Sequence, residues 1–295
     1  MLGRCAKRRG TIALLCLAVT GCAATNGAPA DGGSGEAVVA DARADAETAA
    51  VADAPVSDGA EGGDGVGGAQ PAEPLDAPAP AIAQDYYMDE NYILRPKDEN
   101  GERRVALLTF DDGPKDEALL RSMLDTLDEH GAKAIFFVNG YRAERSPELL
   151  SVIRERGHAI GNHAWDHVDL KRAEPEEMER QIEDVQRFVR DVVGEAPTFF
   201  RPPFGAGDDA VKAKASEEGL LYMTWSNGSR DWMKGYDDPE KVQASVLEQL
   251  HPGSNILMHE LPWTAEALDG LLEAIKAEGY EFLDPARIDP AHSKK

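Results

Sequence analysis

The residues of this chain best suited to chemistry begin with two adjacent carboxylates. Asp111 and Asp112 follow an apolar run and precede a Gly-Pro break. Two carboxylates this close do not both stay ionised without a compensating cation. A divalent metal ion would provide one, with one carboxylate bound to the ion and the other taking a proton from an activated water. Asp-Asp-Gly-Pro is also good turn sequence, so a simple turn is the alternative for this motif taken alone.

A histidine pair could supply further ligands. His163 and His167 are four residues apart, close enough to converge on one ion from a helical turn or a compact loop. Two imidazoles and one carboxylate leave open positions for a water and a substrate oxygen, as hydrolysis requires. The same set also describes the facial triad of non-haem iron oxygenases, and the histidines could instead cap a turn or lie on the surface. His130 and His158 have no matching partner and are expected to be structural.

Polar and aromatic groups follow two more apolar runs. Arg201 lies in Phe-Arg-Pro-Pro-Phe-Gly, whose prolines fix a turn that can aim a backbone N–H and deliver a guanidinium to a carboxylate. His259 ends a buried run, where it could donate a proton, and Asp231 could orient it. Trp232 and Leu257 could wall a small apolar pocket. Loop rigidity and ordinary core packing are the alternatives for these residues.

The elements that must position these residues alternate between strands and helices. Short apolar runs predict buried strands at 105–110, 134–138, 198–200, 221–225, 255–258 and 280–283. Amphipathic stretches predict helices at 117–130, 146–157, 175–193, 210–218, 239–250 and 264–277. This alternation favours a parallel α/β architecture, either an open doubly wound sheet or a barrel. In both, active residues lie at the carboxyl ends of the strands, where these motifs lie.

Charge and cysteine usage narrow the classes of function. The chain has 295 residues, with 31 basic and 54 acidic side chains and a net charge of −23. Because this charge repels nucleic acid and anionic lipid, neither is an expected partner. All three cysteines lie in the first 22 residues. The rest of the chain therefore forms no disulfide and holds no thiol nucleophile or cysteine-based zinc finger.

The first 84 residues predict an export signal and a tether. Basic residues precede the apolar run at 11–19, which is too short to cross a bilayer, and Val-Thr-Gly-Cys at 19–22 resembles a bacterial lipobox. We expect a signal peptide at 1–21 and a lipid on Cys22, with an ordinary secretory signal as the alternative. Residues 22–84 are acidic, rich in Ala, Gly and Pro and without aromatics, which predicts a disordered tether. The lipid would be the only membrane contact and would hold the domain at 85–295 outside the cytoplasm, in the periplasm or at the cell surface.

Together, the motifs resemble those of the polysaccharide deacetylases, carbohydrate esterase family 4, whose domain is called the NodB homology domain. In chain order they are Thr-Phe-Asp-Asp-Gly-Pro, His-x-x-x-His, Arg-Pro-Pro-Phe-Gly, Asp-Trp and Leu-Met-His, and they span roughly residues 105–283. The resemblance implies a distorted (β/α) barrel with about seven parallel strands, which periodicity alone does not separate from an open sheet.

The resemblance also implies a metal centre and a base. Asp112, His163 and His167 would bind one divalent ion, zinc by default, with cobalt, nickel or manganese as the other candidates. Asp111 would be the general base, and Arg201 would tune it.

The remaining motif residues would complete the site by the same resemblance. The backbone N–H of Phe204 would stabilise the oxyanion. His259, oriented by Asp231, would protonate the departing amine. Trp232 and Leu257 would enclose the acetyl methyl group.

Three residues depart from the family's usual pattern. Ala164 stands where Ser or Thr is usual, Phe204 where Tyr is usual, and Gly228 where Asp is common. Ala164 would leave the histidine loop without a bracing hydroxyl. Phe204 should matter little to a main-chain donor, and Gly228 leaves the orienting role to Asp231.

The sequence therefore predicts a lipid-anchored, metal-dependent N-deacetylase that acts on an acetylated glycan outside the cytoplasm. Peptidoglycan N-acetylglucosamine is the first expected substrate, and a chitin-like oligosaccharide is the second. An O-acetyl polysaccharide esterase, a non-catalytic glycan-binding lipoprotein and an iron oxygenase are the alternatives. The sequence indicates no protein partner.

Overall fold

A computed structural model describes residues 82–293 of the chain. The expected signal peptide, the lipidation site Cys22 and the tether up to residue 81 lie outside this range. Within the described residues, no helix combines the length and the apolar character that a bilayer crossing needs.

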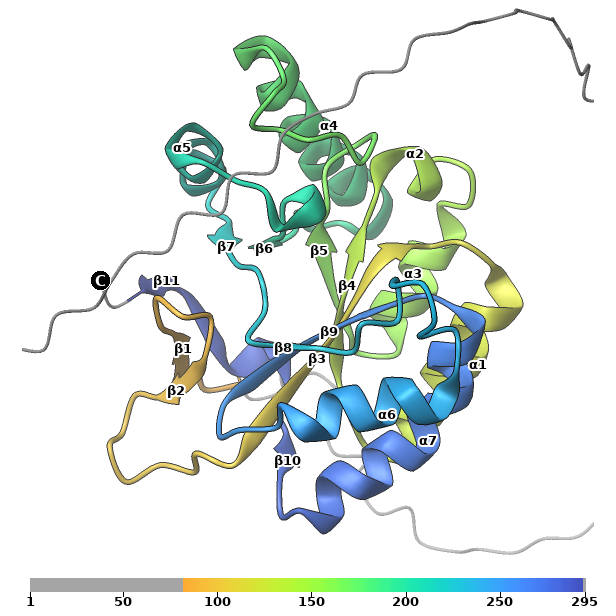
Figure 1. The fold of residues 1–295 in the computed structure, drawn as a ribbon. Helices are drawn as coiled ribbons and strands as arrows, with labels where there is room; N and C mark the ends of the chain where they lie inside the picture. The colour runs from red at the N-terminus through yellow and green to blue at the C-terminus, as the bar shows by residue number, and fades with distance from the viewer. Residues whose placement is uncertain (1–81, 294–295) are drawn as a thin grey trace, which may run out of the picture. The chain divides into compact units, whose positions relative to one another are not determined.

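Seven parallel strands form the central sheet (Figure 1). In spatial order they are β7 (Leu221–Tyr222), β6 (Phe199–Phe200), β5 (Ala159–Asn162), β4 (Ala134–Val138), β3 (Val105–Gly113), β9 (Ser254–His259) and β8 (Asn227–Gly228). A short eighth strand, β10 (Glu281–Phe282), pairs in parallel with the start of β3. The pairing runs from β7 to β8 without joining these two edges, so the barrel is distorted and open. The predicted fold, a distorted (β/α) barrel with about seven parallel strands, is confirmed.

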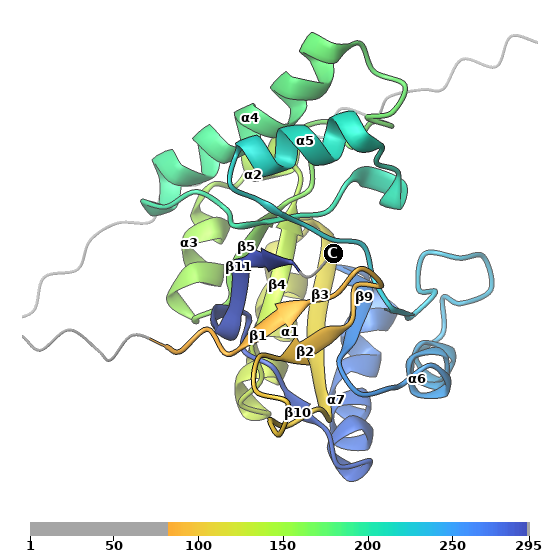
Figure 2. The same ribbon diagram turned by 90° about the vertical axis from the view of Figure 1, so that its left-hand side faces the viewer.

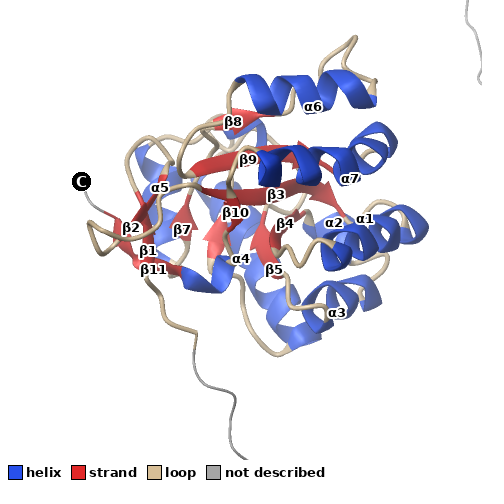
Figure 3. Ribbon diagram, turned by 90° about the horizontal axis from the view of Figure 1, so that it is seen from below, coloured by secondary structure: helices blue, strands red, loops and turns tan. Residues whose placement is uncertain are grey.

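Helices cover the outer face of this curved sheet (Figure 3). They are α1 (Glu117–Glu129), α2 (Gly140–Ala143), α3 (Glu148–Glu155), α4 (Pro175–Val193), α5 (Asp209–Glu217), α6 (Pro239–Glu248) and α7 (Pro262–Ala277), with 3₁₀ turns η1 (Pro203–Gly205) and η2 (Pro285–Arg287). Helices α1, α5 and α6 each begin after an aspartate whose side chain accepts backbone N–H groups of the first turn. Gly194 ends α4 in the left-handed conformation, with φ 86°. The predicted helices are therefore present, with ends that differ by a few residues.

Alternating residues of β3 serve two cores. Leu108 and Phe110 belong to the core between the sheet and the outer helices. Val105 and Leu107 point to the other face and belong to a second core. This alternation buries β3 on both faces, and β3 lies inside the sheet between β4 and β9.

The second core is closed by a small sheet that the sequence did not predict. Its strands, in spatial order, are β11 (Ile288–Ser293), β1 (Tyr86–Met88) and β2 (Leu94–Pro96). Figure 2 shows it in front of the main sheet, and its buried residues include Tyr86 and Ile288. β1 and β11 come from opposite ends of the described residues, so no local sequence pattern predicts their pairing. Strand β5 was also absent from the predicted apolar runs because it is short and ends in Gly-Asn.

Candidate active site

The predicted site residues gather at the carboxyl ends of the parallel strands. β3 ends with the two aspartates and β9 ends with His259, and the pairing of β3 with β9 sets Asp111 directly opposite His259. The histidine pair follows β5, Arg201 follows β6, and Asp231 follows β8. The parallel topology therefore brings five motifs that are distant in the sequence to the same end of the sheet.

Three side chains converge as a metal site would require. Asp112, His163 and His167 each offer one ligand atom, and these atoms lie within 4.8 Å of one another. Asp112 Oδ1 is 3.2 Å from His167 Nε2 and 3.5 Å from His163 Nε2. Asp112 Oδ1 is also buried and has no hydrogen-bond partner. An unpartnered carboxylate oxygen facing two imidazole nitrogens fits a divalent cation.

The hydrogen bonding of His163 sets its tautomer. His163 Nδ1 lies 2.7 Å from the backbone carbonyl oxygen of Arg201. Because a carbonyl can only accept, Nδ1 carries the hydrogen, and the lone pair is left on Nε2, which faces Asp112. A histidine that binds a metal ion commonly donates its other ring N–H to an oxygen in this way, which fixes the orientation of the ring.

The surroundings of Asp112 and His167 shift their pKa values toward the protonation states that bind a metal ion. Burial alone would raise the pKa of Asp112, but His163 and His167 lower it below its ordinary value. Burial, followed by the neighbouring His163, lowers the pKa of His167. A carboxylate and a neutral imidazole are the forms that bind a metal ion.

The loops that carry these ligands have strained backbones. Asp112, Ala164 and His167 have φ values of 67°, 61° and 54°, in a region that non-glycine residues seldom occupy. The histidine loop is braced by Asn162 Oδ1, which accepts from the backbone N–H of Ala164, and by Asn139 Nδ2, which donates to the His163 carbonyl. Two asparagines thus hold the loop that lacks a hydroxyl at position 164.

The charge of Asp111, the neighbour of the proposed ligand Asp112, is compensated by an arginine. Arg201 Nη1 donates to Asp111 Oδ1 over 2.7 Å, and both side chains are buried. The guanidinium also donates to Thr109 Oγ1 and to the Thr224 carbonyl, and it lies 4.4 Å from the ring centre of Phe137. The other carboxylate oxygen, Oδ2, lies 3.7 Å from His163 Nε2, on the side of the ligand cluster.

A histidine–aspartate pair faces the cluster. Asp231 is buried, and its Oδ1 is 2.7 Å from His259 Nδ1, while its Oδ2 accepts from the His259 backbone N–H and from Thr264 Oγ1. Burial alone would lower the pKa of His259, but the hydrogen bond and the charge of Asp231 raise it above its ordinary value. The pair therefore favours a protonated imidazole with Nε2 left to donate.

Aromatic rings flank these polar groups. The Trp232 ring centre is 5.2 Å from that of His259, and Trp232 is 46% exposed. The Phe204 ring centre is 4.6 Å from that of His167, and Phe204 has φ 60°. Leu257 is buried within β9, opposite Thr109 and Gly228, so its contact with an acetyl group stays a prediction.

Several polar residues that support the site were not predicted from the sequence. Asn139 directly follows β4, Asn162 ends β5, and Thr264 and Glu260 follow His259 at the end of β9. All four are buried, and each makes a hydrogen bond to a motif residue or to its loop. For Asn139, Asn162 and Glu260, a position at or directly after a strand end was the available signal, whereas Thr264 lies within α7 and had none.

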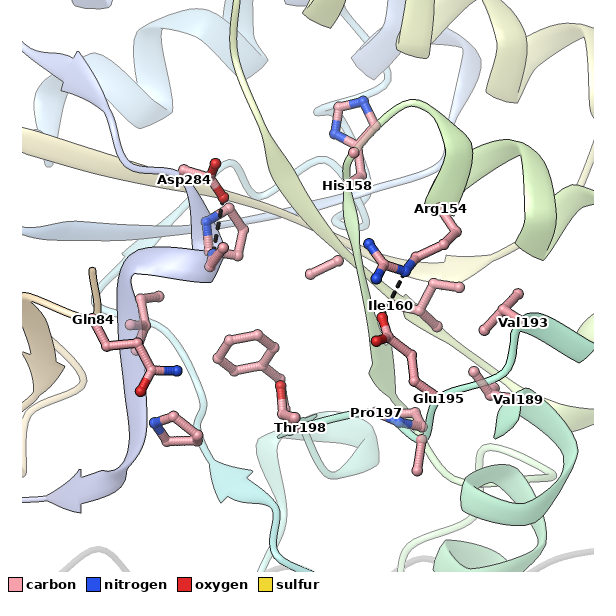
Figure 4. Close-up of a pocket in the computed structure, with 18 residues that line it drawn as sticks. Gln84, Arg154, His158, Ile160, Val189, Val193, Glu195, Pro197, Thr198 and Asp284 are labelled. Atoms are coloured by element: carbon pink, nitrogen blue, oxygen red, sulfur yellow. Dashed lines mark hydrogen bonds and ion pairs between the residues drawn. The ribbon is translucent and has the colours of Figure 1, made fainter. Parts of the chain in front are cut away.

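A hollow of about 440 Å³ lies at the opposite ends of the strands (Figure 4). Its walls include Thr198 and the ion pair between Arg154 and Glu195, and it contains none of the motif residues. His158 also lines it, and its Nδ1 accepts the backbone N–H of Ala134. His130, outside this hollow, pairs with Asp269. Both histidines therefore make structural contacts away from the ligand cluster.

Comparison with known proteins gives one consistent family. The sequence model of the polysaccharide deacetylases matches residues 98–223. Peptidoglycan-N-acetylglucosamine deacetylase PgdA of Listeria monocytogenes is 39% identical over 194 residues, which are 65% of this chain and 40% of that protein. A peptidoglycan-N-acetylglucosamine deacetylase of Bacillus cereus is 35% identical over 195 residues, which are 64% of this chain and 89% of that protein. The solved structure of the Bc1960 peptidoglycan N-acetylglucosamine deacetylase is 33% identical, with a TM-score of 0.58, over 61% of this chain and 86% of that one.

Proposed function

This chain belongs to the polysaccharide deacetylase family, and we propose from that premise that it hydrolyses N-acetyl groups on a glycan outside the cytoplasm. Peptidoglycan N-acetylglucosamine is the first substrate proposed, because the relatives above are named for it. The observation that carries the proposal is the convergence of Asp112, His163 and His167 beside the buried Asp111–Arg201 pair.

We propose that Asp112, His163 and His167 hold one divalent ion, with zinc as the default for a site of two imidazoles and one carboxylate. When bound, this ion would supply a Lewis acid and lower the pKa of a water molecule. Because Arg201 occupies Oδ1 of Asp111, the proton of the attacking water would be held at Oδ2, which faces the ligands.

The opposite side of the site would handle the leaving group. His259 would give a proton from Nε2 to the departing amine nitrogen, while Asp231 keeps the hydrogen on Nδ1. The backbone N–H of Phe204 would donate to the oxyanion, and Trp232 with Leu257 would exclude water around the acetyl methyl group. Base and acid would thus stand at the ends of the adjacent strands β3 and β9.

The membrane attachment proposed here rests on the sequence alone. Cys22 would carry the lipid, and residues 22–84 would link it to the domain at 85–295. Replacing Cys22 by Ser should move the protein from the membrane fraction to the soluble fraction. A variant that still sediments with membranes after a salt wash would remove the lipid anchor from the proposal.

The test of the activity is acetate release by the full chain, loaded with zinc, from N-acetylated peptidoglycan fragments and from O-acetylated glycans. An amide nitrogen leaves only after protonation, whereas an alkoxide leaves with less help, so His259→Ala should impair N-deacetylation far more than hydrolysis of an aryl acetate. Activity on O-acetyl esters alone would identify an esterase instead. Binding of glycan without acetate release would identify a non-catalytic protein, and activity without oxygen would exclude an oxygenase.

A further inference from the structure

Glu260 is a buried carboxylate beside the site to which no motif assigns a role. It follows His259 and is 1% exposed. Its Oε1 accepts the backbone N–H groups of Lys115 and Asp116, over 2.7 and 3.0 Å. Its own backbone N–H donates to the Asp111 carbonyl. One residue therefore joins the end of β9 to the end of β3 and to the start of α1.

The segment between these two attachment points, residues 112–116, contains the last two residues of β3 and the turn that follows them, and it carries the ligand Asp112. Asp112 has φ 67°, in the left-handed region that non-glycine residues seldom occupy. The next residue, Gly113, fits closely against Glu260, because a Cβ atom added there would lie 2.6 Å from Glu260 Oε2. The Glu260 side chain thus packs on the turn and also bonds to its far end.

The bonded end of the turn also contacts the ligand. Lys115 Nζ lies 3.9 Å from Asp112 Oδ2. The backbone that Glu260 fixes therefore also places a cation beside the second carboxylate oxygen of Asp112. Loss of the Glu260 side chain would free the backbone of Lys115 and would remove the packing that supports the strained residue Asp112. Asp112 Oδ1 would then no longer be held within 3.5 Å of both imidazoles.

We propose that Glu260 is a positioning residue that holds Asp112 in its ligand geometry by tying the turn at 112–116 to the end of β9. The inference rests on the proposed function, because it takes Asp112 as a metal ligand. It links the two halves of the site, since the strand that carries His259 also fixes the turn that carries Asp112.

Two variants separate this role from general stabilisation of the fold. Glu260→Ala removes both accepted hydrogen bonds, whereas Glu260→Gln keeps an oxygen that can accept them. His158→Ala is the matched control, because His158 is equally buried and also accepts a backbone N–H from a neighbouring strand, but at the other end of the sheet. The measurement is zinc titration of the metal-free full chain, together with its melting temperature and with kcat and KM for acetate release.

We expect Glu260→Ala to weaken zinc binding by about 10- to 100-fold, the usual effect of removing a residue that orients a ligand. Glu260→Gln should stay within about threefold of the parent, and His158→Ala should lower the melting temperature without changing zinc affinity. In zinc-saturated Glu260→Ala, kcat should fall while KM changes little, because the reacting groups and not the binding surface are displaced.

Parent-like zinc affinity in a folded Glu260→Ala variant would overturn the inference, as would an equal loss of affinity in His158→Ala. If Glu260→Ala does not fold, Glu260→Asp decides, because its shorter side chain should weaken both bonds to the turn and hence zinc binding. A parent chain that binds no zinc would instead remove the proposed metal centre, and this inference with it.

Discussion

The two ends of the parallel strands are built differently. At the carboxyl end, non-glycine residues have positive φ values in the loops that carry the ligands and the aromatic walls, at Asp112, Ala164, His167, Phe204 and Arg230. Among the described residues, Tyr92 in the β1–β2 loop is the one other non-glycine residue with such a φ. At the amino end, the hollow of Figure 4 is lined by residues without this strain. Backbone strain is therefore concentrated where ligand geometry is needed.

The ion pairs at the two ends of the strands differ in burial. Arg201 and Asp111 form a fully buried ion pair at the carboxyl end, with an N–O distance of 2.7 Å. Arg154 and Glu195 form a pair of almost equal length, 2.6 Å, at the amino end, but their side chains are 48% and 58% exposed. If burial and not distance decides the energetic weight of a pair, substitutions at the two ends should differ by several kcal/mol.

The largest effect is expected from Asp111→Asn at the carboxyl end. The amide cannot take a proton, so the rate of acetate release should fall by about 10²- to 10⁴-fold. Zinc affinity should change little, because the proposed ligands are retained. The measurement is kcat on an N-acetylated oligosaccharide together with zinc content.

The contrast between rate and metal content makes Asp111→Asn decisive. A rate within a few-fold of the parent would remove Asp111 from the mechanism. Loss of zinc along with the activity would mean that Asp111 and Asp112 have exchanged roles.

Arg201→Met should give the next largest effect, now on stability. The substitution leaves the Asp111 carboxylate buried without its cation, which typically costs about 3–5 kcal/mol. The free energy of unfolding, measured by urea denaturation of the metal-free full chain, should fall by that amount. A decrease below about 1 kcal/mol would mean that the pair is solvated in solution and that the two ends do not differ in this respect.

The sequence predicted the carboxyl end better than the rest of the fold. Asp111, Arg201 and His259 each follow a short apolar run, and parallel pairing brings such strand ends together. His163 was found from its spacing to His167 and not from an apolar run, because β5 is short and ends in Gly-Asn. The roles assigned to them remain predictions, because their geometry shows proximity and not chemistry.

What the sequence could not show depends on contacts between distant segments. Glu260 meets Lys115 across 145 residues, and β1 pairs with β11 across about 200. The left-handed backbone of Ala164 could not be predicted either, because that conformation is typical of glycine and not of alanine. Local sequence patterns thus identified the residues at the carboxyl ends of the strands, but not the distant residues that hold them in place through contacts.

His158 offers a test of the amino end through its pH dependence. Burial lowers the pKa of His158 from its ordinary 6.5 to about 4. Between these values the unfolded chain binds a proton and the folded chain does not, so stability from His158 is present above about pH 6.5 and is lost as the pH falls to about 4. The loss should be on the order of 3 kcal/mol.

The variant His158→Gln isolates this contribution. Glutamine has no proton to gain, so the parent and the variant should converge in stability as the pH falls from 7 to 4. Zinc affinity at pH 7 should be unchanged, because His158 lies at the opposite end from the ligands. Parallel stability curves for the two proteins would show that His158 is already accessible to protons in the folded state.

The smallest effect is expected from Glu195→Gln at the amino end. The ion pair of Glu195 with Arg154 is as short as the buried pair at the carboxyl end, but water solvates both of its partners and salt screens them. The free energy of unfolding should therefore fall by less than about 1 kcal/mol, and by still less at high salt. Zinc affinity and kcat should match the parent, because the Arg154–Glu195 pair lines the hollow at the amino end, which contains none of the proposed ligands. A loss above about 2 kcal/mol would show that distance and not burial sets the strength of these pairs. A change in kcat would show that the amino end is coupled to the site, so that strain at the carboxyl end depends on contacts at both ends of the strands.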